Sequence, residues 1–446
     1  MHYFDFFSII LHADRKNKVM KRKFFCCLMV VAASTAALAQ GGTKSPYSQF
    51  GLGVLSDESQ GMSRGMNGTG IALRRGSEIN TLNPASYSGV DSLTMLFDAG
   101  VALQKTSFKE KSVRQNVSMG NFEYVVGSFR LLSNVGLAFG LLPVTGIGYS
   151  YTTSTYLDNT NGSIVESYTG SGGLHQAFLG VGVNLLKPLS VGVNVGYLWG
   201  DINRSVISSS TTYINSLKKE FSASVKSYKL DVGVQWEQPV GKTDKLTVGA
   251  TVGIGHNLGT NPELTIVNTN SVSARSDTTS YSIDNAFHLP MSYGVGLSYF
   301  YNYRLTVAAD AQLQKWGELD FPYFNSSQSK FEQVSGLLKD RLRLSGGVDW
   351  LPNPLGRHYL SHVHYRMGVG YSTPYYYIEG KDGPKEFSVS AGIGMPIANM
   401  YNNRSILNIS GQWVRTSAPG MITENTFRIN IGLTFNERWF AKWKVE

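Results

Sequence analysis

Apolar and polar residues alternate along many stretches of this chain, and the alternation has a period of two. In the stretch 424–437, Phe427 and Ile429 flank Arg428, and the same alternation continues to Phe435. Successive side chains of a β-strand point to opposite faces of a sheet, so the pattern predicts strands with one apolar and one polar face. Period two over about ten residues, repeated many times, is typical of a transmembrane β-barrel, with lipid on one side of the wall and the lumen on the other.

The alternating stretches predict about fourteen strands, which turn and loop signals separate. These strands are 92–105, 134–142, 144–156, 175–184, 189–206, 221–237, 246–260, 281–300, 304–316, 340–351, 362–371, 385–396, 404–415 and 424–437. Residues 116–131 fit either a further strand or a periplasmic elbow. The expected fold is an all-β, antiparallel transmembrane barrel of about fourteen strands.

The predicted connections fall into two classes of length. Short ones suit periplasmic turns, and they lie at 187–188, 301–303 and 399–403. Long polar ones suit extracellular loops, and they lie at 157–174, 207–220, 261–280, 317–339, 352–361 and 372–384. A secreted β-sandwich is the alternative fold, but it would lack this contrast and would favour strands of about six residues.

The first 39 residues have the features of a secretory signal peptide. Residues 21–23 form a positive region, residues 24–36 an apolar region, and Ala37-Leu38-Ala39 a cleavage site. Met20 directly precedes the positive region and is a second candidate start, which would make residues 1–19 an over-called extension. Both cysteines of the chain lie in the apolar region, so we expect the mature chain to have no disulfide, no cysteine-bound metal and no cysteine nucleophile.

The amino-acid composition is consistent with a membrane barrel and gives no indication of a nucleic-acid-binding protein. Charged residues make up only 16% and aromatic residues 12% of the sequence, as a barrel with an apolar outer band and aromatic girdles requires. Without residues 1–39 the balance is 34 basic to 29 acidic residues, which is too mild to indicate a nucleic-acid partner, and no basic stripe interleaved with aromatics occurs. After the signal peptide no apolar run reaches the roughly 18 residues of a transmembrane helix. We therefore expect a Gram-negative outer-membrane barrel with no nucleic-acid partner.

Residues 60–90 depart from the alternation. Glycine recurs there too closely for a stable helix, since each interior glycine costs about 1 kcal/mol against alanine. The triplet Asn83-Pro84-Ala85 then favours an extended or turn conformation, because proline restricts both itself and the residue before it. A compact, kinked plug fits these residues better than a strand does.

This segment combines a glycine-rich run with an Asn-Pro-Ala triplet. The residues of the motif are Gly65, Met66, Gly68, Gly70, Ala72, Asn83, Pro84 and Ala85. Together they resemble the N-terminal hatch of the FadL-type family, the outer-membrane transporters of long-chain fatty acids and aromatic hydrocarbons. The resemblance implies that residues 40–91 form an N-terminal extension and hatch, which plugs a barrel formed by residues 92–446.

The same resemblance implies outer-membrane transport of a hydrophobic compound, with a hydrophobic small molecule or lipid as the ligand. Family members bind a long apolar molecule between hatch and wall and release it sideways into the membrane lipid. Sideways release needs a wall strand with broken pairing, and proline and glycine weaken pairing. Pro143, Gly146 and Gly148 are therefore the candidate lateral gap. An ordinary periplasmic turn at Pro143 is an equally supported alternative.

Charged residues of both signs fall on the predicted lumen rows. The candidates for a polar network in the lumen are Arg341, Arg343, Asp349, Arg366, Asp310 and Arg428. Because buried charges must be paired, we favour a satisfied network that anchors the hatch over a site for a ligand carboxylate.

Two local patterns of the sequence resemble sites that carry chemistry. Residues 240–243, Val-Gly-Lys-Thr, end like a phosphate-binding loop, but Trp236 occupies the position of the first glycine. His362 and His364 are predicted to share a strand face, but no third ligand or catalytic partner accompanies them. We therefore expect no enzyme, no cofactor and no metal site.

Two other functional classes remain open. A related branch of the FadL-type family serves as a non-transporting outer-membrane partner of a protein secretion system. A structural or adhesive barrel, whose long loops bind envelope components, is the third class. A ligand-sized apolar pocket between hatch and wall would favour transport, whereas a lumen packed solid by the hatch would favour the partner role.

Overall fold

The computed structural model describes residues 42–156, 162–210, 215–398 and 404–438. The predicted signal peptide and the predicted turn at 399–403 lie outside these residues. In the part of the chain that is described, no helix has the length and apolar character needed to cross a membrane.

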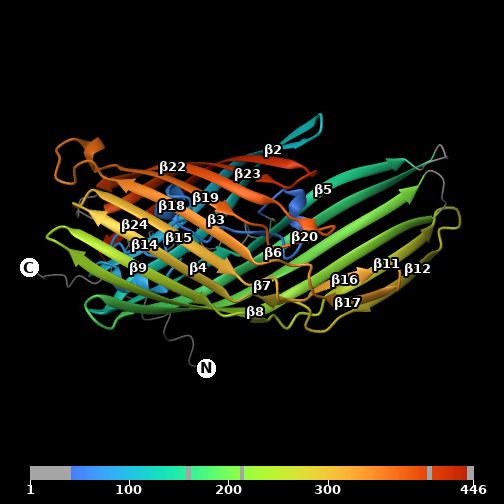
Figure 1. Ribbon diagram of the computed structural model, residues 1–446, viewed down its shortest axis with the longest axis horizontal. Coiled ribbons are helices and arrows are strands. Elements are labelled where there is room, and N and C mark those ends of the chain that lie inside the picture. The colour runs from blue at the N-terminus through green and yellow to red at the C-terminus, as the bar shows by residue number, and fades with distance from the viewer. Residues whose placement is uncertain (1–41, 157–161, 211–214, 399–403, 439–446) are drawn as a thin grey trace, which may run out of the picture. The chain divides into compact units, whose positions relative to one another are not determined.

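Fourteen antiparallel strands form a closed barrel, which confirms the predicted fold class (Figure 1). In ring order they are β2 (Thr94–Glu110), β3 (Val113–Leu132), β4 (Val135–Pro143), β6 (Ser163–Asn184), β7 (Leu189–Ser210), β8 (Asn215–Val240), β9 (Asp244–Gly253), β14 (Ser292–Tyr301), β15 (Leu305–Gln314), β18 (Arg341–Trp350), β19 (His364–Ser372), β22 (Lys385–Ala398), β23 (Arg404–Ser417) and β24 (Thr423–Arg438). The ring closes where β2 pairs with β24.

The alternation sorts the side chains of each strand between the two faces of the wall. In β24, Phe427 is 54% exposed and Phe435 is 49% exposed, whereas Asn430 and Asn436 are buried inside. Val295 of β14, at 59%, shows the same outward exposure. An apolar outer surface that runs around the ring is stable against hydrocarbon rather than water.

The count of fourteen strands agrees with the prediction, although two errors cancel in it. Residues 116–131, ambiguous by pattern, belong to the wall strand β3. The predicted strand 144–156 is β5 (Thr145–Tyr156), which takes no place of its own in the ring. Instead, β4 pairs with the second half of β6 and β5 pairs with its first half. β4 and β5 are thus two parts of one interrupted wall strand.

Several predicted loops are strands. Most of the predicted loop 157–174 is the start of β6, and most of 207–220 is the end of β7 and the start of β8. The predicted loop 261–280 forms the hairpin of β11 (Glu263–Asn270) and β12 (Ser276–Ser282), and β11 pairs with β8. Strands that extend beyond the hydrocarbon meet water on both faces, so their sequence loses the alternation that reveals a strand.

The connection 351–363 lies at the end opposite to the one predicted for it. It joins β18 to β19, and the amide of Leu351 donates to the carbonyl oxygen of Arg304, 2.7 Å away, in the short turn between β14 and β15. We call this side of the barrel the short-turn end. The other side, the long-loop end, also carries the pairs β10 (His256–Asn257) with β13 (His288–Leu289), β16 (Phe321–Asn325) with β17 (Lys330–Val334), and β20 (Tyr377–Ile378) with β21 (Lys381–Asp382).

Residues 42–93, which we call the plug, precede the wall. The plug holds η2 (Pro46–Gln49), β1 (Val54–Leu55), α3 (Gly61–Gly65) and η3 (Pro84–Gly89). α3 contacts β19, β22, β23 and β24, whereas η3 contacts β3, β4, β6, β7 and β8. Because these strands lie on opposite sides of the ring, the plug occupies the lumen.

Candidate functional site

Glycines of the wall make room for the plug. A Cβ atom at Gly192 of β7 would lie 2.3 Å from the carbonyl carbon of Pro84, and one at Gly368 of β19 would lie 2.3 Å from that of Met66. Side chains at these positions are therefore incompatible with the plug in place. The contact is backbone against backbone on two sides of the lumen.

The side chain of Asn83 ties three backbone segments together. Its Oδ1 accepts from the amide of Ala85 at 3.1 Å and so caps η3. Its Nδ2 donates to the carbonyl oxygens of Ile71 at 2.9 Å and Val234 at 3.1 Å, with a longer contact to Ala250 at 3.4 Å. The Asn83-Pro84-Ala85 turn is thus anchored both to the plug and to strands β8 and β9.

The glycine-rich run lets charged wall residues approach the plug backbone. The amides of Gly70 and Ile71 donate to Oδ2 of Asp310 at 2.6 and 2.9 Å. Gly68 has φ +77°, and a Cβ atom there would lie 2.2 Å from Nη2 of Arg343. At Gly68 the positive φ and the approach of Arg343 favour glycine, whereas at Gly70 a Cβ atom would lie 2.6 Å from Cδ1 of Leu82 within the plug.

The six candidates for the lumen network form separate groups. The most buried group centres on Arg366, which donates to Glu78 at 3.0 Å and lies 3.5 Å from Asp349. Arg75 of the plug and His364 also bind Asp349, the latter at 3.0 Å. Arg366, Glu78 and Asp349 are each at most 2% exposed at the side chain. The two carboxylates are balanced by the guanidinium groups of Arg366 and Arg75.

Gly65 of the motif belongs with this group. A Cβ atom at Gly65 would lie 3.0 Å from Cβ of Arg366, so the small residue lets the arginine pass beside α3. Met66 and Ala72 are also buried, at 0% and 1% exposure. All motif residues therefore lie at the boundary between plug and wall.

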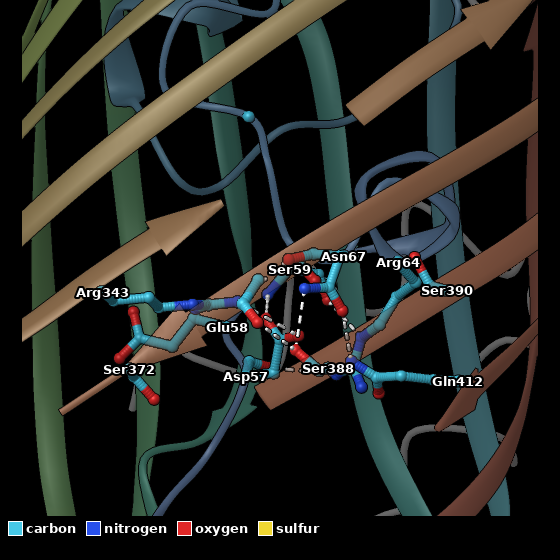
Figure 2. A network of polar contacts seen from close by, with 12 residues as sticks. Asp57, Glu58, Ser59, Arg64, Asn67, Arg343, Ser372, Ser388, Ser390 and Gln412 are labelled. Carbon is cyan, nitrogen blue, oxygen red and sulfur yellow. Dashed lines mark hydrogen bonds and ion pairs between the residues drawn. The ribbon is translucent and has the colours of Figure 1, made fainter. Parts of the chain in front are cut away.

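A second group lies around Asp57 (Figure 2). Arg343 lies 3.6 Å from Asp57 and also donates to the carbonyl oxygen of Asn67 at 3.3 Å. Arg64 donates to the carbonyl oxygen of Asp57 and pairs with Glu123 of β3 at 2.8 Å. Burial by itself raises the pKa of the Asp57 carboxyl, but the guanidinium groups of Arg343 and Arg64 outweigh burial and hold that pKa well below its usual range.

The remaining two candidates bind only neutral partners among the described residues. Arg428 donates to Gln104 at 3.1 Å and to Gln412 at 3.3 Å. Arg341 donates to Ser372 at 3.4 Å.

Sequence reasoning missed the charged residues of the plug itself. Arg64, Arg75 and Glu78 supply half of the ion pairs described above. A signal was present, since charged residues in a segment predicted to be enclosed need partners on the enclosing wall.

The wall ladder is interrupted between β3 and β5. β3 pairs with β4 only as far as the pair Val125–Leu141. Beyond that pair, in the described residues, the ladder partners of 113–124 are all on β2. β5 pairs with β6 and, at its start, with β1 of the plug through Val54–Gly146. We call this interruption the wall opening.

The first described residues of the plug lie in the wall opening. Asn121 of β3 donates to the carbonyl oxygen of Gly42 at 2.8 Å. On the other side, the hydroxyl of Ser48 accepts from the amide of Gly148 at 3.1 Å. The segment 42–55 thus spans from the edge of β3 to the edge of β5. Of the candidate gap residues, Gly146 and Gly148 contact this segment, and Pro143 ends β4 directly before the interruption.

A family model described as BamG matches residues 20–446. The chain belongs to the BamG family. A search of curated proteins finds no match. The FadL-type resemblance is therefore correct for the fold, as the solved structures below show, while the family that the chain matches is BamG.

Three solved structures resemble this BamG-family barrel. They are the Pseudomonas putida toluene transporter TodX (TM-score 0.61, 15% identity, 86% of this chain and 100% of that chain), the Ralstonia pickettii toluene transporter TbuX (0.59, 14%, 85% and 98%) and a Pseudomonas aeruginosa FadL homologue (0.56, 12%, 86% and 98%). At these identities the likeness establishes the fold alone.

Apolar side chains line the lumen of the BamG-family barrel between the long loops and the wall opening. The buried cluster joins Tyr47 and Leu52 of the plug to Ile147 of β5. Its other members are Val144, Tyr149, Leu174, Leu198, Ile202, Ala223, Val225, Leu258, Phe287, Leu289, Trp316, Leu338, Tyr375, Tyr376, Ile378 and Ala418. One face of the wall opening is therefore apolar on the lumen side.

Two hollows of different kinds accompany these contacts. One lies between the plug and the wall beside Gly61, Arg64 and Tyr124, and its volume is about 10 Å³, room for about one water molecule. The other, about 570 Å³, lies on the outer face of the wall over Val295 and Leu344. The second hollow faces away from the lumen.

The two histidines do not form a pair. His362 lies in η4 (Tyr359–His362), where its Nε2 donates to the carbonyl oxygen of Gly356 at 2.6 Å. His364 begins β19 and binds Asp349. The prediction that they share a strand face is wrong, because the strand starts after His362. Among the described residues no three acidic, histidine or cysteine side chains are placed to hold a metal ion.

Proposed function

We propose that this barrel spans the Gram-negative outer membrane and passes a hydrophobic small molecule or lipid sideways through the wall opening. The observation that carries the proposal is the interrupted ladder between β3 and β5, with the segment 42–55 lying in it. Two of the solved structures with this fold are described as toluene transporters, which supports the same class of cargo.

The apolar cluster supports a route to the opening. Ile147 and Tyr149 of β5 contribute to it directly. Its members are buried, so a solute that enters from the long-loop end must displace these apolar side chains to reach the wall. Transfer from there into the membrane favours an apolar solute by about 0.8 kcal/mol per CH₂ group removed from water. A sideways exit gains this energy, whereas an exit into the periplasm does not.

The strength of the contacts indicates which part of the plug moves. The segment 42–55 is held by the two ladder pairs of β1, by burial of Tyr47 and Leu52 in the apolar cluster, and by side-chain hydrogen bonds to several strands and loops, each hydrogen bond with a net value of about 0.5–1.5 kcal/mol. Among the described residues it has no ion pair with the wall. The rest of the plug is held by Asn83 and by the buried ion pairs of Arg366. Displacement of 42–55 alone opens the wall at lower cost than removal of the plug.

A reversible cross-link tests this function. Val54 and Gly146 are direct partners in an antiparallel ladder, and such partners lie about 4.5–5.5 Å apart at Cα, within the range of a disulfide. In V54C/G146C we expect uptake of a radiolabelled fatty acid to stop on oxidation and to return on reduction. The control is V295C/A311C, a ladder pair of β14 and β15 outside the plug.

Continued uptake by the oxidised V54C/G146C protein would exclude exit at the wall opening. If the unmodified protein takes up no fatty acid or toluene at all, the second candidate function replaces the first.

The second candidate is a non-transporting barrel that serves a protein secretion system. β6, β7 and β8 have 22, 22 and 26 residues, about twice what a spanning strand needs. Together with β11 and β12 they continue past the other wall strands as an extended sheet (Figure 1). Such a sheet in water suits contact with protein. Replacement of residues 263–282 by a short turn should then impair protein export and leave uptake unchanged.

A further inference from the structure

The connection 351–363 is a folded loop rather than a flexible turn. The amide of Asn353 donates to the carbonyl oxygen of Ser361 at 3.0 Å, and His362 donates to that of Gly356 at 2.6 Å. Pro352 and Pro354 restrict the backbone between these bonds. The loop therefore has a defined shape.

This folded loop turns its apolar side chains outwards. Leu355 is 92% exposed and Leu360 67% exposed. Arg357 and His358, between them, are exposed as well. Exposed apolar side chains on a loop that hydrogen bonds hold in one shape are typical of a binding surface. Their burial by a partner stabilises the complex, and little conformational entropy of the loop is lost on binding.

The short-turn end carries cations that lack a carboxylate partner. Lys187, Lys242 and Arg304 are exposed on three further connections, and none of them takes part in an ion pair among the described residues. Two carboxylates of this end are already engaged: Glu237 pairs with Lys245, and Asp244 accepts from Tyr299 and Asn302.

The long-loop end has both paired and unpaired cations. Four of its lysines are paired, in Lys315–Asp340, Lys339–Asp382, Lys330–Glu332 and Lys218–Glu220, whereas Lys109, Lys111 and Lys381 are exposed and take part in no ion pair among the described residues. The short-turn end is distinguished by unpaired cations at the same end as the exposed Leu355 and Leu360 of the folded loop.

The plug adds to this charge in the middle of the ring. Arg74 binds Ser190 and Asn184, both neutral, where β6 and β7 meet at the short-turn end. Lipid headgroups around the circumference contact the cations on the rim of the barrel but not Arg74 in the lumen. A protein that covers this end contacts the rim cations and Arg74 together.

We propose that the short-turn end, which faces the periplasm in an outer-membrane barrel, docks an acidic periplasmic protein. Leu355 and Leu360 enter an apolar cleft of that protein, and Arg357, Lys242 and Arg304 face its carboxylates. The surface serves this partner whether or not the barrel passes a solute.

Photo-crosslinking in the native cells tests the proposal. A benzophenone amino acid replaces Leu355 or, in a second variant, Leu360, and the adduct is identified by mass spectrometry. The control places the same probe at Val272, which is 81% exposed on the β11–β12 hairpin at the long-loop end. We expect an adduct with one acidic periplasmic protein from the first two positions and not from Val272.

Charge reversal makes the result specific. K242E/R304E should reduce the adduct about tenfold, which corresponds to about 1.4 kcal/mol of association free energy. The matched reversal K218E/K330E, at the other end, should leave it unchanged. Heat-modifiable migration in electrophoresis checks that each barrel is folded.

Three results would overturn the proposal. The first is an adduct with lipid in place of protein, which would assign the surface to the membrane. The second is the absence of an adduct from both position 355 and position 360. The third is a protein adduct whose yield K242E/R304E does not reduce.

Discussion

Val54 of the plug and Gly146 of β5 are direct partners in an antiparallel ladder. The start of the β5 edge that would otherwise face β3 is thus covered by the protein's own N-terminal segment. An unpaired strand edge is costly in a membrane, because its amide and carbonyl groups find no water. The plug therefore provides hydrogen-bond partners for backbone groups of the β5 edge, and it also fills the lumen.

Hydrogen exchange should divide the plug in two. Amides of 42–55 are expected to exchange faster than those of 61–72 and 83–89, because the ion pair of Arg64 and the ties of Asn83 hold the latter two, whereas no ion pair among the described residues holds the first segment. The measurement is native-state exchange with mass spectrometry on the detergent-solubilised barrel. Equal protection across the plug would argue against separate movement of the first segment.

Replacement of Asn83 by alanine should loosen the plug while the barrel stays folded. The change leaves the amide of Ala85 without its partner and removes one donor from the carbonyl oxygens of Ile71 and Val234, of which that of Ile71 keeps Gln235. A buried group left unsatisfied costs about 1–3 kcal/mol. Faster protease cleavage of the plug is the measurement.

Asn83→Asp is the matched control for the cap alone. It keeps the acceptor for Ala85 and loses the donor, so it should loosen the plug as well. A plug of normal resistance in N83D would assign the effect to the cap of η3 and not to the ties to β8 and β9.

Replacement of Arg366 by methionine should destabilise the plug strongly. It leaves Glu78 without its arginine and Asp349 with Arg75 and His364 alone. Removal of one partner of a buried pair costs about 3–5 kcal/mol. Urea unfolding followed by tryptophan fluorescence measures the loss. The double variant R366M/E78Q leaves no unpaired charge at that pair, so it should recover part of the lost stability. No recovery would show that the packing of Arg366 beside Gly65 contributes more to stability than the ion pair does.

Gly192→Ala should displace the plug. The added Cβ atom would lie 2.3 Å from the carbonyl carbon of Pro84, and overpacking of this kind costs about 1–3 kcal/mol. Gly346→Ala is the control in the same wall, because its Cβ atom would meet nothing closer than 3.7 Å. Protease resistance of the plug should fall in the first variant only; equal resistance in both would mean that the wall yields instead.

The sequence by itself determined the fold class, and its strand count of fourteen agrees only because two errors in strand assignment cancel. A strand in the hydrocarbon has one face in lipid and one in the lumen, so period two in β24, from Phe427 to Phe435, follows directly from the two environments. The plug is also visible in the sequence, because glycine is favoured at Gly68, where φ is +77° and Arg343 of the wall approaches the backbone.

Tertiary structure alone decided where the strands end and which charges pair. The outer parts of β6 to β8 are solvated on both faces, so no alternation marks them. The connection 351–363 is long although it lies at the short-turn end, since its length serves its own folded loop. Arg366 and Glu78 are 288 residues apart in sequence, and only closure of the ring around the plug brings such charges within hydrogen-bond distance.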